Sequence, residues 1–189
     1  MELFTGIFTA FGLSASAGLN AYIPLLAVGL IAHYAPLLLT LTSPWDTLAN
    51  PWIILLLCIL VIIEMLADKI PAVNHINDLI QTFIRPVAGA IAFAASTNTV
   101  TKVHPVLALA CGLLVAGTVH LTKSAVVRPV VTATTGGAAN TPVSLAEDAI
   151  ATIVSILAIL VPVIIGTLIV VAIAFVIYWF YNRSSTQTT

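Results

Sequence analysis

Four carboxylates of this sequence form two close pairs at the ends of apolar runs. Glu64 and Asp68 are four residues apart, which places both on one face of a helix, and Asp148 directly follows Glu147. An ionised side chain inside hydrocarbon costs about 2.5 to 3.5 kcal/mol, so it needs a partner or a water-filled cavity. Glu64 lies a turn deeper than Asp68 and is the better functional candidate, because snorkelling or an interfacial ion pair with Lys69 or Arg85 would explain Asp68 equally well.

The second pair has a competing structural explanation. Ser144 precedes Glu147 by three residues, the spacing of a capping box, in which each side chain bonds the other residue's backbone N–H. Acidic residues also stabilise the positive end of a helix dipole. These effects account for Glu147 fully and for Asp148 only weakly, which leaves a binding role open for Asp148.

Basic residues are expected at the same membrane level as these carboxylates. The candidate binding residues are Asn20, Glu64, Asp68, Lys69, Arg85, Lys123, Glu147 and Asp148. Such a cluster can relay protons, hold a charged solute, or bind a hard divalent cation through oxygen ligands. As a metal site it would use Glu64, Asp68, Glu147 and Asp148. No cofactor is expected, and the histidines are not spaced as a ligand set, although His120 could titrate near neutral pH if it faces the cluster.

The first apolar segment carries a run of small residues that ends at Asn20 and Pro24. Small residues let neighbouring helices approach closely, so close packing is one explanation for the run from Gly12 to Gly18. Proline has no backbone N–H, so Pro24 frees the carbonyl of the residue one turn earlier, here Asn20. Because breaks of this kind form binding sites in transporter helices, Asn20 is the strongest mid-membrane candidate.

Composition places most of the chain in a membrane. Of 189 residues, 60% are hydrophobic and 7% are charged, against roughly a quarter charged in a soluble domain. Long apolar runs without short alternating strands indicate helices rather than a barrel. Six Lys and Arg residues and a net charge of −1 exclude a basic nucleic-acid surface, so the expected partners are membrane lipids and a small solute or ion. The absence of common catalytic signatures argues against an enzyme.

Hydropathy predicts a single all-α domain, a transmembrane bundle of about six segments, because a span needs about 20 mostly apolar residues. The predicted spans are 4–33, 51–68, 86–98, 105–122, 145–162 and 164–182. The third is short and is either a span or a re-entrant half-helix. The last two are divided at Pro162 and Gly166, with one long kinked helix over 145–181 as the alternative.

Two segments between the spans are predicted to lie at the inner surface. Within 71–85 four apolar residues recur at helical spacing, which indicates an amphipathic helix in the membrane interface. These residues are Val73, Ile76, Ile80 and Phe83. Residues 124–141 are rich in Thr, Gly and Ala and too polar to span, so they are predicted to form an inner loop.

The basic residues predict the orientation, because cytoplasmic loops are enriched in Lys and Arg. With the N-terminus inside, one basic residue, Lys102, is outside and five are cytosolic. The five are Lys69, Arg85, Lys123, Arg128 and Arg183. The first segment is not preceded by the positive region of a cleaved signal peptide, so it is expected to be retained. The sequence therefore predicts a multi-pass protein of the bacterial inner membrane with both termini cytosolic.

Four motifs occur in order along nearly the whole chain. They are Ala17-Gly-Leu-Asn-Ala-Tyr-Ile-Pro-Leu, Glu64-x-x-x-Asp68-Lys69-x-Pro71, Gln81-Thr-Phe-Ile-Arg-Pro86 and Val143-Ser-Leu-Ala-Glu-Asp148. This combination resembles an uncharacterised bacterial membrane family, domain of unknown function 4126. The resemblance implies no established activity. It implies that the family shares the polar positions at Asn20, Glu64, Asp68, Lys69, Arg85 and the Glu147–Asp148 pair.

The leading hypothesis is a small transporter or channel-like protein with a polar cavity on the cytosolic side, coupled to protons or cations. Six short helices enclose little volume, so a homo-oligomer is expected, with the small-residue face of the first segment as the contact. The first alternative is a non-transporting accessory or lipid-binding protein, in which the charges only lock helices together. The second and less favoured alternative is an intramembrane enzyme acting on lipid headgroups.

Overall fold

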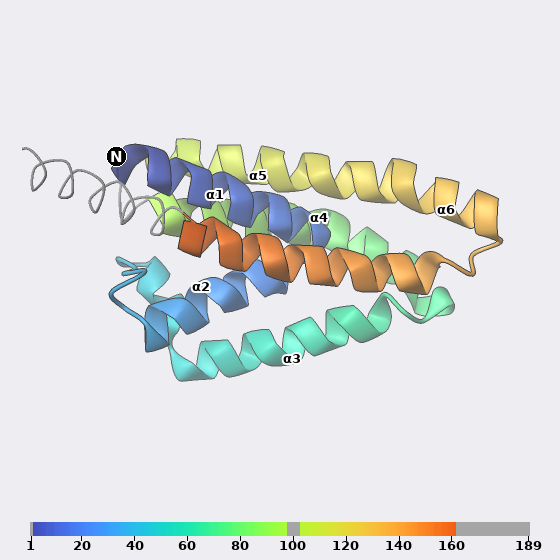
Figure 1. Ribbon diagram of the computed structural model, residues 1–189, viewed down its shortest axis with the longest axis horizontal. Helices are drawn as coiled ribbons and strands as arrows, with labels where there is room; N and C mark the ends of the chain where they lie inside the picture. Colours follow the sequence, from blue (N-terminus) through green and yellow to red (C-terminus); the bar gives the residue numbers. More distant parts are fainter. Residues whose placement is uncertain (1, 98–102, 162–189) are drawn as a thin grey trace, which may run out of the picture.

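The computed structural model describes residues 2–97 and 103–161, and their side chains except at 2–5 and 71–75. Within these ranges every regular element is a helix, which confirms the predicted all-α bundle (Figure 1). The elements are α1 (Glu2–Leu19), α2 (Tyr22–Tyr34), the 3-10 helix η1 (Trp45–Ala49), α3 (Pro51–Ala67), α4 (Pro71–Thr97), α5 (Pro105–Thr122), the π-helical turn η2 (Lys123–Val127) and α6 (Arg128–Thr135). A last helix covers Asn140–Val161.

The first apolar segment is a hairpin and not the single span predicted for 4–33. α1 and α2 are separated at Asn20 and Ala21, and α2 runs back toward the end of the bundle where α1 starts (Figure 1). Side-chain contacts agree with this reversal, because Trp45, which follows α2, packs against a cluster that contains Ala10 of α1. Hydropathy is similar on both arms of the hairpin, so it could not reveal the reversal.

α4 joins two segments that the sequence analysis separated. The amphipathic helix predicted at 71–85 is present, but it continues without interruption through Pro86 to Thr97. Its polar positions recur every four residues and turn toward the bundle, while its apolar positions are exposed. The inward residues are Asn77, Gln81 and Arg85, and the exposed ones are Ile76, Ile80 and Phe83. The amphipathic pattern therefore belongs to a helix with a polar inner face and an apolar outer face.

The helix of α5 continues through η2 into α6, as one rod from Pro105 to Thr135. The prediction of an inner loop over 124–141 is therefore wrong for residues 124–135, and only 136–139 form a turn. Threonine hydroxyls bond to carbonyls one turn earlier within the rod, as Thr135 does to Val131 at 2.7 Å, so the polar composition does not prevent a helix. The chain turns after Thr135, where Gly136 has a φ of 62°, a conformation that glycine adopts without strain.

Three helices of the described residues are long and apolar enough to cross a membrane. They are Ile76–Thr97, Pro105–Thr135 and Asn140–Val161, and shorter apolar helices cover Gly6–Leu19, Tyr22–Tyr34 and Pro51–Ala67. Large apolar side chains on the outer face of α3 are exposed, among them Leu55, Ile59 and Ile62. This is the arrangement of a membrane protein. The span predicted over 164–182 and the division at Pro162 lie outside the described residues.

Small residues bring α1, α4 and α5 into close contact. The hydroxyl of Ser14 donates to the carbonyl of Gly89 at 2.7 Å, and a Cβ added to Gly18 would lie 2.5 Å from the Cβ of Val119. Such contacts need small side chains on both sides. The small-residue face of α1 is therefore occupied within the chain, and a contact with a second copy would need another surface.

Candidate functional site

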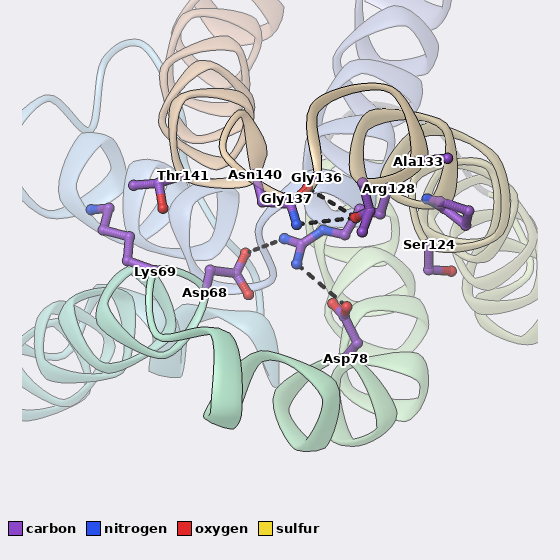
Figure 2. A pocket seen from close by; sticks show the side chains of 12 residues that line it. Asp68, Lys69, Asp78, Ser124, Arg128, Ala133, Gly136, Gly137, Asn140 and Thr141 are labelled. Atoms are coloured by element: carbon purple, nitrogen blue, oxygen red, sulfur yellow. Dashed lines mark hydrogen bonds and ion pairs between the residues drawn. The ribbon is translucent and has the colours of Figure 1, made fainter.

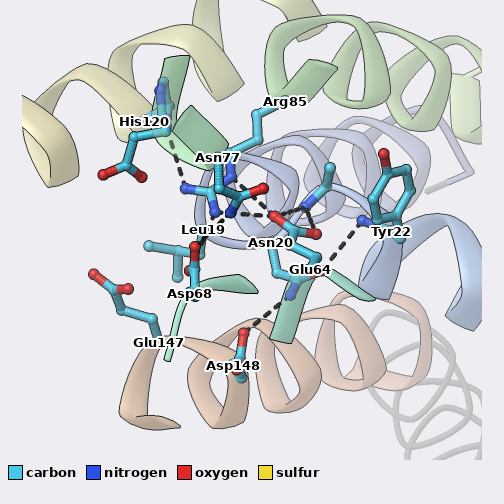
Figure 3. A network of polar contacts seen from close by, with 12 residues as sticks. Leu19, Asn20, Tyr22, Glu64, Asp68, Asn77, Arg85, His120, Glu147 and Asp148 are labelled. Carbon is cyan, nitrogen blue, oxygen red and sulfur yellow. Dashed lines mark hydrogen bonds and ion pairs between the residues drawn. The ribbon is translucent and has the colours of Figure 1, made fainter. Parts of the chain in front are cut away.

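The candidate site lies at the tip of the α1–α2 hairpin, where two helix ends meet inside the bundle (Figure 3). Asn20 fills the gap, since its Oδ1 accepts hydrogen bonds from the backbone N–H groups of Tyr22 and Ile23, both at 3.2 Å. Asparagine is a favoured cap at this place. In a continuous helix the carbonyl of Asn20 would lack its partner, because Pro24 has no N–H. The local sequence therefore favours the break.

Glu64 of α3 holds the start of α2. Its oxygens Oε1 and Oε2 accept from the backbone N–H of Ala21 at 3.3 and 3.1 Å. Arg85 of α4 donates to Oε1 from Nε at 3.1 Å and from Nη2 at 2.9 Å. Glu64 and Arg85 are both fully buried. A negative charge is stabilised at the N-terminus of a helix, and the charge-assisted bonds from Arg85 offset part of the cost of burying the carboxylate.

Lys123 makes the opposite contact at the end of α1. Its Nζ donates to the backbone carbonyl of Leu19 at 3.1 Å, and the same ammonium pairs with Glu147 at 2.8 Å and with Asp68 at 3.5 Å. The last carbonyls of a helix lack partners within the helix and carry partial negative charge, so a cation is favourable there. The two ends at the hairpin tip are thus held by charges of opposite sign.

Asp68, which follows the end of α3, connects the two halves of the site. Its Oδ2 lies 3.0 Å from Nη2 of Arg128 and 3.6 Å from Nη2 of Arg85, and its Oδ1 accepts from the amide of Asn77 at 2.6 Å. Burial alone raises the pKa of Asp68. Lys123, Arg85 and Arg128 together outweigh burial and lower the pKa below its ordinary value of 3.8.

His120 of α5 is buried beside Arg85. Nη1 of Arg85 lies 3.2 Å from Nδ1 of His120, and Nε2 lies 3.1 Å from the hydroxyl of Thr82. Since arginine can only donate, Nδ1 accepts and the proton of a neutral ring is on Nε2. That proton is then donated to Thr82, whose hydroxyl donates to the carbonyl of Asp78 at 2.7 Å. The imidazole thereby fixes one edge of the guanidinium.

Asp148 of the last helix contacts the hairpin tip through Asn20. The amide of Asn20 donates to its Oδ1 at 3.0 Å (Figure 3). Asp148 is only 4% exposed, and its Oδ2 has no hydrogen-bond partner among the described residues. Asn20 therefore uses its oxygen to cap α2 and its nitrogen to hold Asp148.

The ion pairs and hydrogen bonds around the hairpin tip form one polar network. A polar cavity of about 700 Å³ reaches this network from the end of the bundle that carries the Gly136 turn. Its lining includes Asp68 and Arg128, which are members of the network, and Asp78, Gly136 and Asn140 (Figure 2). Arg128 lies between the carboxylates of Asp68 and Asp78, at 3.0 and 3.4 Å. The cavity thus ends at the outer ion pairs of the site, and the hairpin tip lies behind them.

The structure places the predicted site residues as follows. It brings seven of them together at the hairpin tip: Asn20, Glu64, Asp68, Arg85, Lys123, Glu147 and Asp148. Lys69 is half-buried and lines the cavity, and it forms no ion pair within the described residues.

The capping box predicted at Ser144 and Glu147 is not formed, because the last helix already begins at Asn140. The hydroxyl of Ser144 lies 3.5 Å from Asp68 instead.

Three further residues belong to the site and were not among the predicted binding residues. Arg128 is in the segment predicted as a loop, and it is five residues from Lys123, a spacing that matches the π-helical turn η2 and not an α-helix. His120 precedes Lys123 by three residues, a spacing that puts both on one helix face. Asn77 is on the polar face of the amphipathic pattern in α4. Helical spacing was therefore the available signal for His120 and Asn77, whereas the position of Arg128 depends on the π-helical turn η2.

A metal centre made of the four carboxylates is not found. Within the described part of the chain, no group of three or more His, Cys, Asp or Glu side chains is arranged to hold a metal ion. Glu64, Asp68 and Glu147 instead face cations.

The apolar helices and the charges buried at the hairpin tip define a helical membrane protein. The chain belongs to the family described as Domain of unknown function (DUF4126), whose model matches residues 7–183. No curated protein and no solved structure matches the chain. The family adds no activity, so function has to be argued from the site.

Proposed function

We propose that the protein is a small membrane transporter in which the hairpin tip closes a path for a small polar or charged solute. The observation that carries this proposal is the position of the network. It links the two helix ends of the tip to Asp68 and Arg128, and these two residues line a cavity that is open at one end of the bundle. Broken helices whose ends face charged groups are a recurring feature of transporter sites.

The tip behaves as a gate in this proposal. The cavity reaches Asp68 and Arg128, whereas Glu64 behind them is 1% exposed. The charged side chains that hold the two helix ends of the tip are Glu64, through Ala21, and Lys123, through Leu19. A solute that competes for these charges would release the tip and open the path toward the other end.

We also propose that the protein lies in the cytoplasmic membrane and that the Gly136 turn faces the cytosol. Lys69, Lys123 and Arg128 lie toward that end, and cytoplasmic ends are enriched in Lys and Arg. Because the α1–α2 hairpin returns to its starting side (Figure 1), this orientation places the N-terminus outside. It therefore revises the prediction of a cytosolic N-terminus.

Accessibility of the tip to water tests the proposal without knowledge of the solute. Cys58 and Cys111 are replaced by Ala, and Tyr22→Cys is introduced at the tip in the full chain, reconstituted in phosphatidylcholine and phosphatidylglycerol vesicles. A membrane-impermeant thiol reagent is added from either side. Transport requires that Tyr22→Cys reacts from both sides. Ile62→Cys, on the exposed apolar face of α3, is the matched control and should not react.

A flux measurement complements the labelling. Electrical currents across the same vesicles are recorded after steps in pH, sodium or phosphate, for the wild type, Glu64→Gln and Asp46→Asn. We expect a current in the wild type and in Asp46→Asn, which alters an exposed carboxylate of η1, and a loss of about tenfold or more in Glu64→Gln, because Arg85 then loses the nearer of its two carboxylates. A tip that no reagent reaches, together with equal currents in all three proteins, contradicts transport and supports a purely structural ion-pair lattice.

A further inference from the structure

Asp148 is a buried carboxylate that forms no ion pair with another described residue. The paired groups of the network are Glu64, Asp68 and Glu147 on one side and Arg85, Lys123 and Arg128 on the other. Three negative groups thus face three positive ones, and Asp78, which also contacts Arg128, is partly exposed at the rim. Among the described residues no Lys or Arg nitrogen lies within 4.0 Å of Asp148.

The free oxygen of this side chain is the second observation. Asp148 is 4% exposed, its Oδ1 is held by Asn20 at 3.0 Å, and its Oδ2 has no partner. Burying a carboxylate without a cation or a hydrogen bond is costly. A single proton on Oδ2 removes that cost and needs no further ligand, whereas a divalent cation needs six or more oxygens.

We propose that Asp148 is a proton-binding site that couples uptake and release of a proton to the hairpin tip. This inference rests on the transport function proposed above and names its coupling ion. The proton comes from hydronium, and one O–H bond forms at Oδ2. The carboxylate becomes a neutral acid, and water is the other product.

Release of the proton places an additional negative charge beside the tip. The charged groups that act on Asp148 are Asp68 and Lys69 after α3 and Lys123 of η2. Glu147 precedes Asp148 on the same helix and is paired with Lys123. Lys123 is also the residue that holds the carbonyl of Leu19 at the end of α1. An ionised Asp148 attracts Lys123 away from that carbonyl, while a neutral Asp148 leaves the contact in place.

Asn20 provides the second link between the proton and the tip. Its nitrogen bonds Oδ1 of Asp148, and its oxygen caps α2 through Tyr22 and Ile23. A change in the charge of Asp148 therefore reaches the first residues of α2 through a single side chain. Both links end at the hairpin tip, which is the element proposed to move.

Infrared difference spectroscopy between acidic and alkaline buffer tests proton binding directly in the reconstituted full chain. A protonated carboxyl group has a C=O stretch separate from that of a carboxylate. We expect such a band in the wild type and in Asp46→Asn, which removes an exposed aspartate of η1. The band should disappear in Asp148→Asn, which has nearly the same shape as the protonated acid and should fold. In Asn20→Ala the band should move to higher frequency, because Oδ1 loses its hydrogen bond.

The outcomes separate the two proposals. A band that persists in Asp148→Asn, or that sodium removes at constant pH, overturns proton binding at Asp148. A second outcome is a current that responds to sodium or phosphate, vanishes in Glu64→Gln, and is unaffected by pH steps and by Asp148→Asn. That outcome supports transport and overturns the coupling to protons. A band that belongs to Asp148 in a protein with an inaccessible tip and no current supports the proton site and contradicts transport.

Discussion

The ammonium of Lys123 bonds the backbone carbonyl of Leu19 at 3.1 Å, across 104 residues of chain. The last carbonyls of α1 have no partner inside the helix, and inside a bundle they have little water to replace one. Lys123 therefore serves as a long-range cap. The contact also gives the continuous helix of α5, η2 and α6 a role at the tip, because Lys123 at the start of η2 points inward and is only 3% exposed.

Replacing Lys123 should destabilise the fold far more than replacing its counterpart Lys69. In Lys123→Met, the end of α1 loses its cap and Glu147 loses its 2.8 Å partner. Removal of one member of a buried pair costs about 3 to 5 kcal/mol. Thermal unfolding in detergent measures the effect. Lys69→Met, at a half-buried position at the cavity, should remain close to wild type, and equal losses in both variants would contradict the capping role.

Arg85 should not be replaceable by lysine. Its guanidinium contacts Glu64 through Nε and Nη2 and His120 through Nη1, and an ammonium cannot make these contacts at once. We expect Arg85→Lys to lose about 3 kcal/mol of stability, nearly as much as Arg85→Met. Arg128→Lys is the matched comparison, because Arg128 lies at the cavity and a point charge can still attract Asp68. If both lysine variants melt alike, the geometry of the guanidinium is not what the site requires.

The close packing of α1 on α5 predicts opposite results at two glycines. A Cβ at Gly18 would lie 2.5 Å from Val119 Cβ and 2.6 Å from the carbonyl of Ala116, whereas a Cβ at Gly117 would meet nothing nearer than 3.7 Å. Gly18→Ala should therefore cost about 2 kcal/mol, and Gly117→Ala should stabilise its helix by about 0.5 to 1 kcal/mol. Unfolding in detergent would reveal both changes, and a neutral Gly18→Ala would show that the hairpin can shift.

The sequence predicted the helical class and most of the site because both follow from local patterns. Glu64 and Asp68 share a helix face by their spacing alone, and their expensive position in an apolar run marks them for partners. Asn20 and Pro24 indicate a break in the first apolar segment, but the reversal of the chain there was not predicted, since it depends on Lys123 and Glu64 meeting the two helix ends. These are contacts between residues distant in sequence, and no local propensity encodes them.

The loop prediction at 124–141 failed for a different reason. Threonine has a low helix propensity in water, but Thr134 and Thr135 bond carbonyls of their own helix at 2.8 and 2.7 Å. The error concealed Arg128, because a loop gives no register from which to infer that it faces Asp68. Assignment of the helix would not have been enough, because Arg128 and Lys123 both reach Asp68 through the π-helical turn η2 between them.

The lowered pKa of Asp68 predicts how stability depends on pH. A carboxylate whose pKa is depressed in the folded state contributes stability above its ordinary pKa, here 3.8, and that contribution is lost as the pH falls through the lower folded value. The difference in melting temperature between wild type and Asp68→Asn should therefore be large near neutral pH and shrink in strong acid. Asp46→Asn, at an exposed position, should melt with wild type throughout. A difference for Asp68→Asn that does not change with pH would show that the contacts of Asp68 do not depend on its charge.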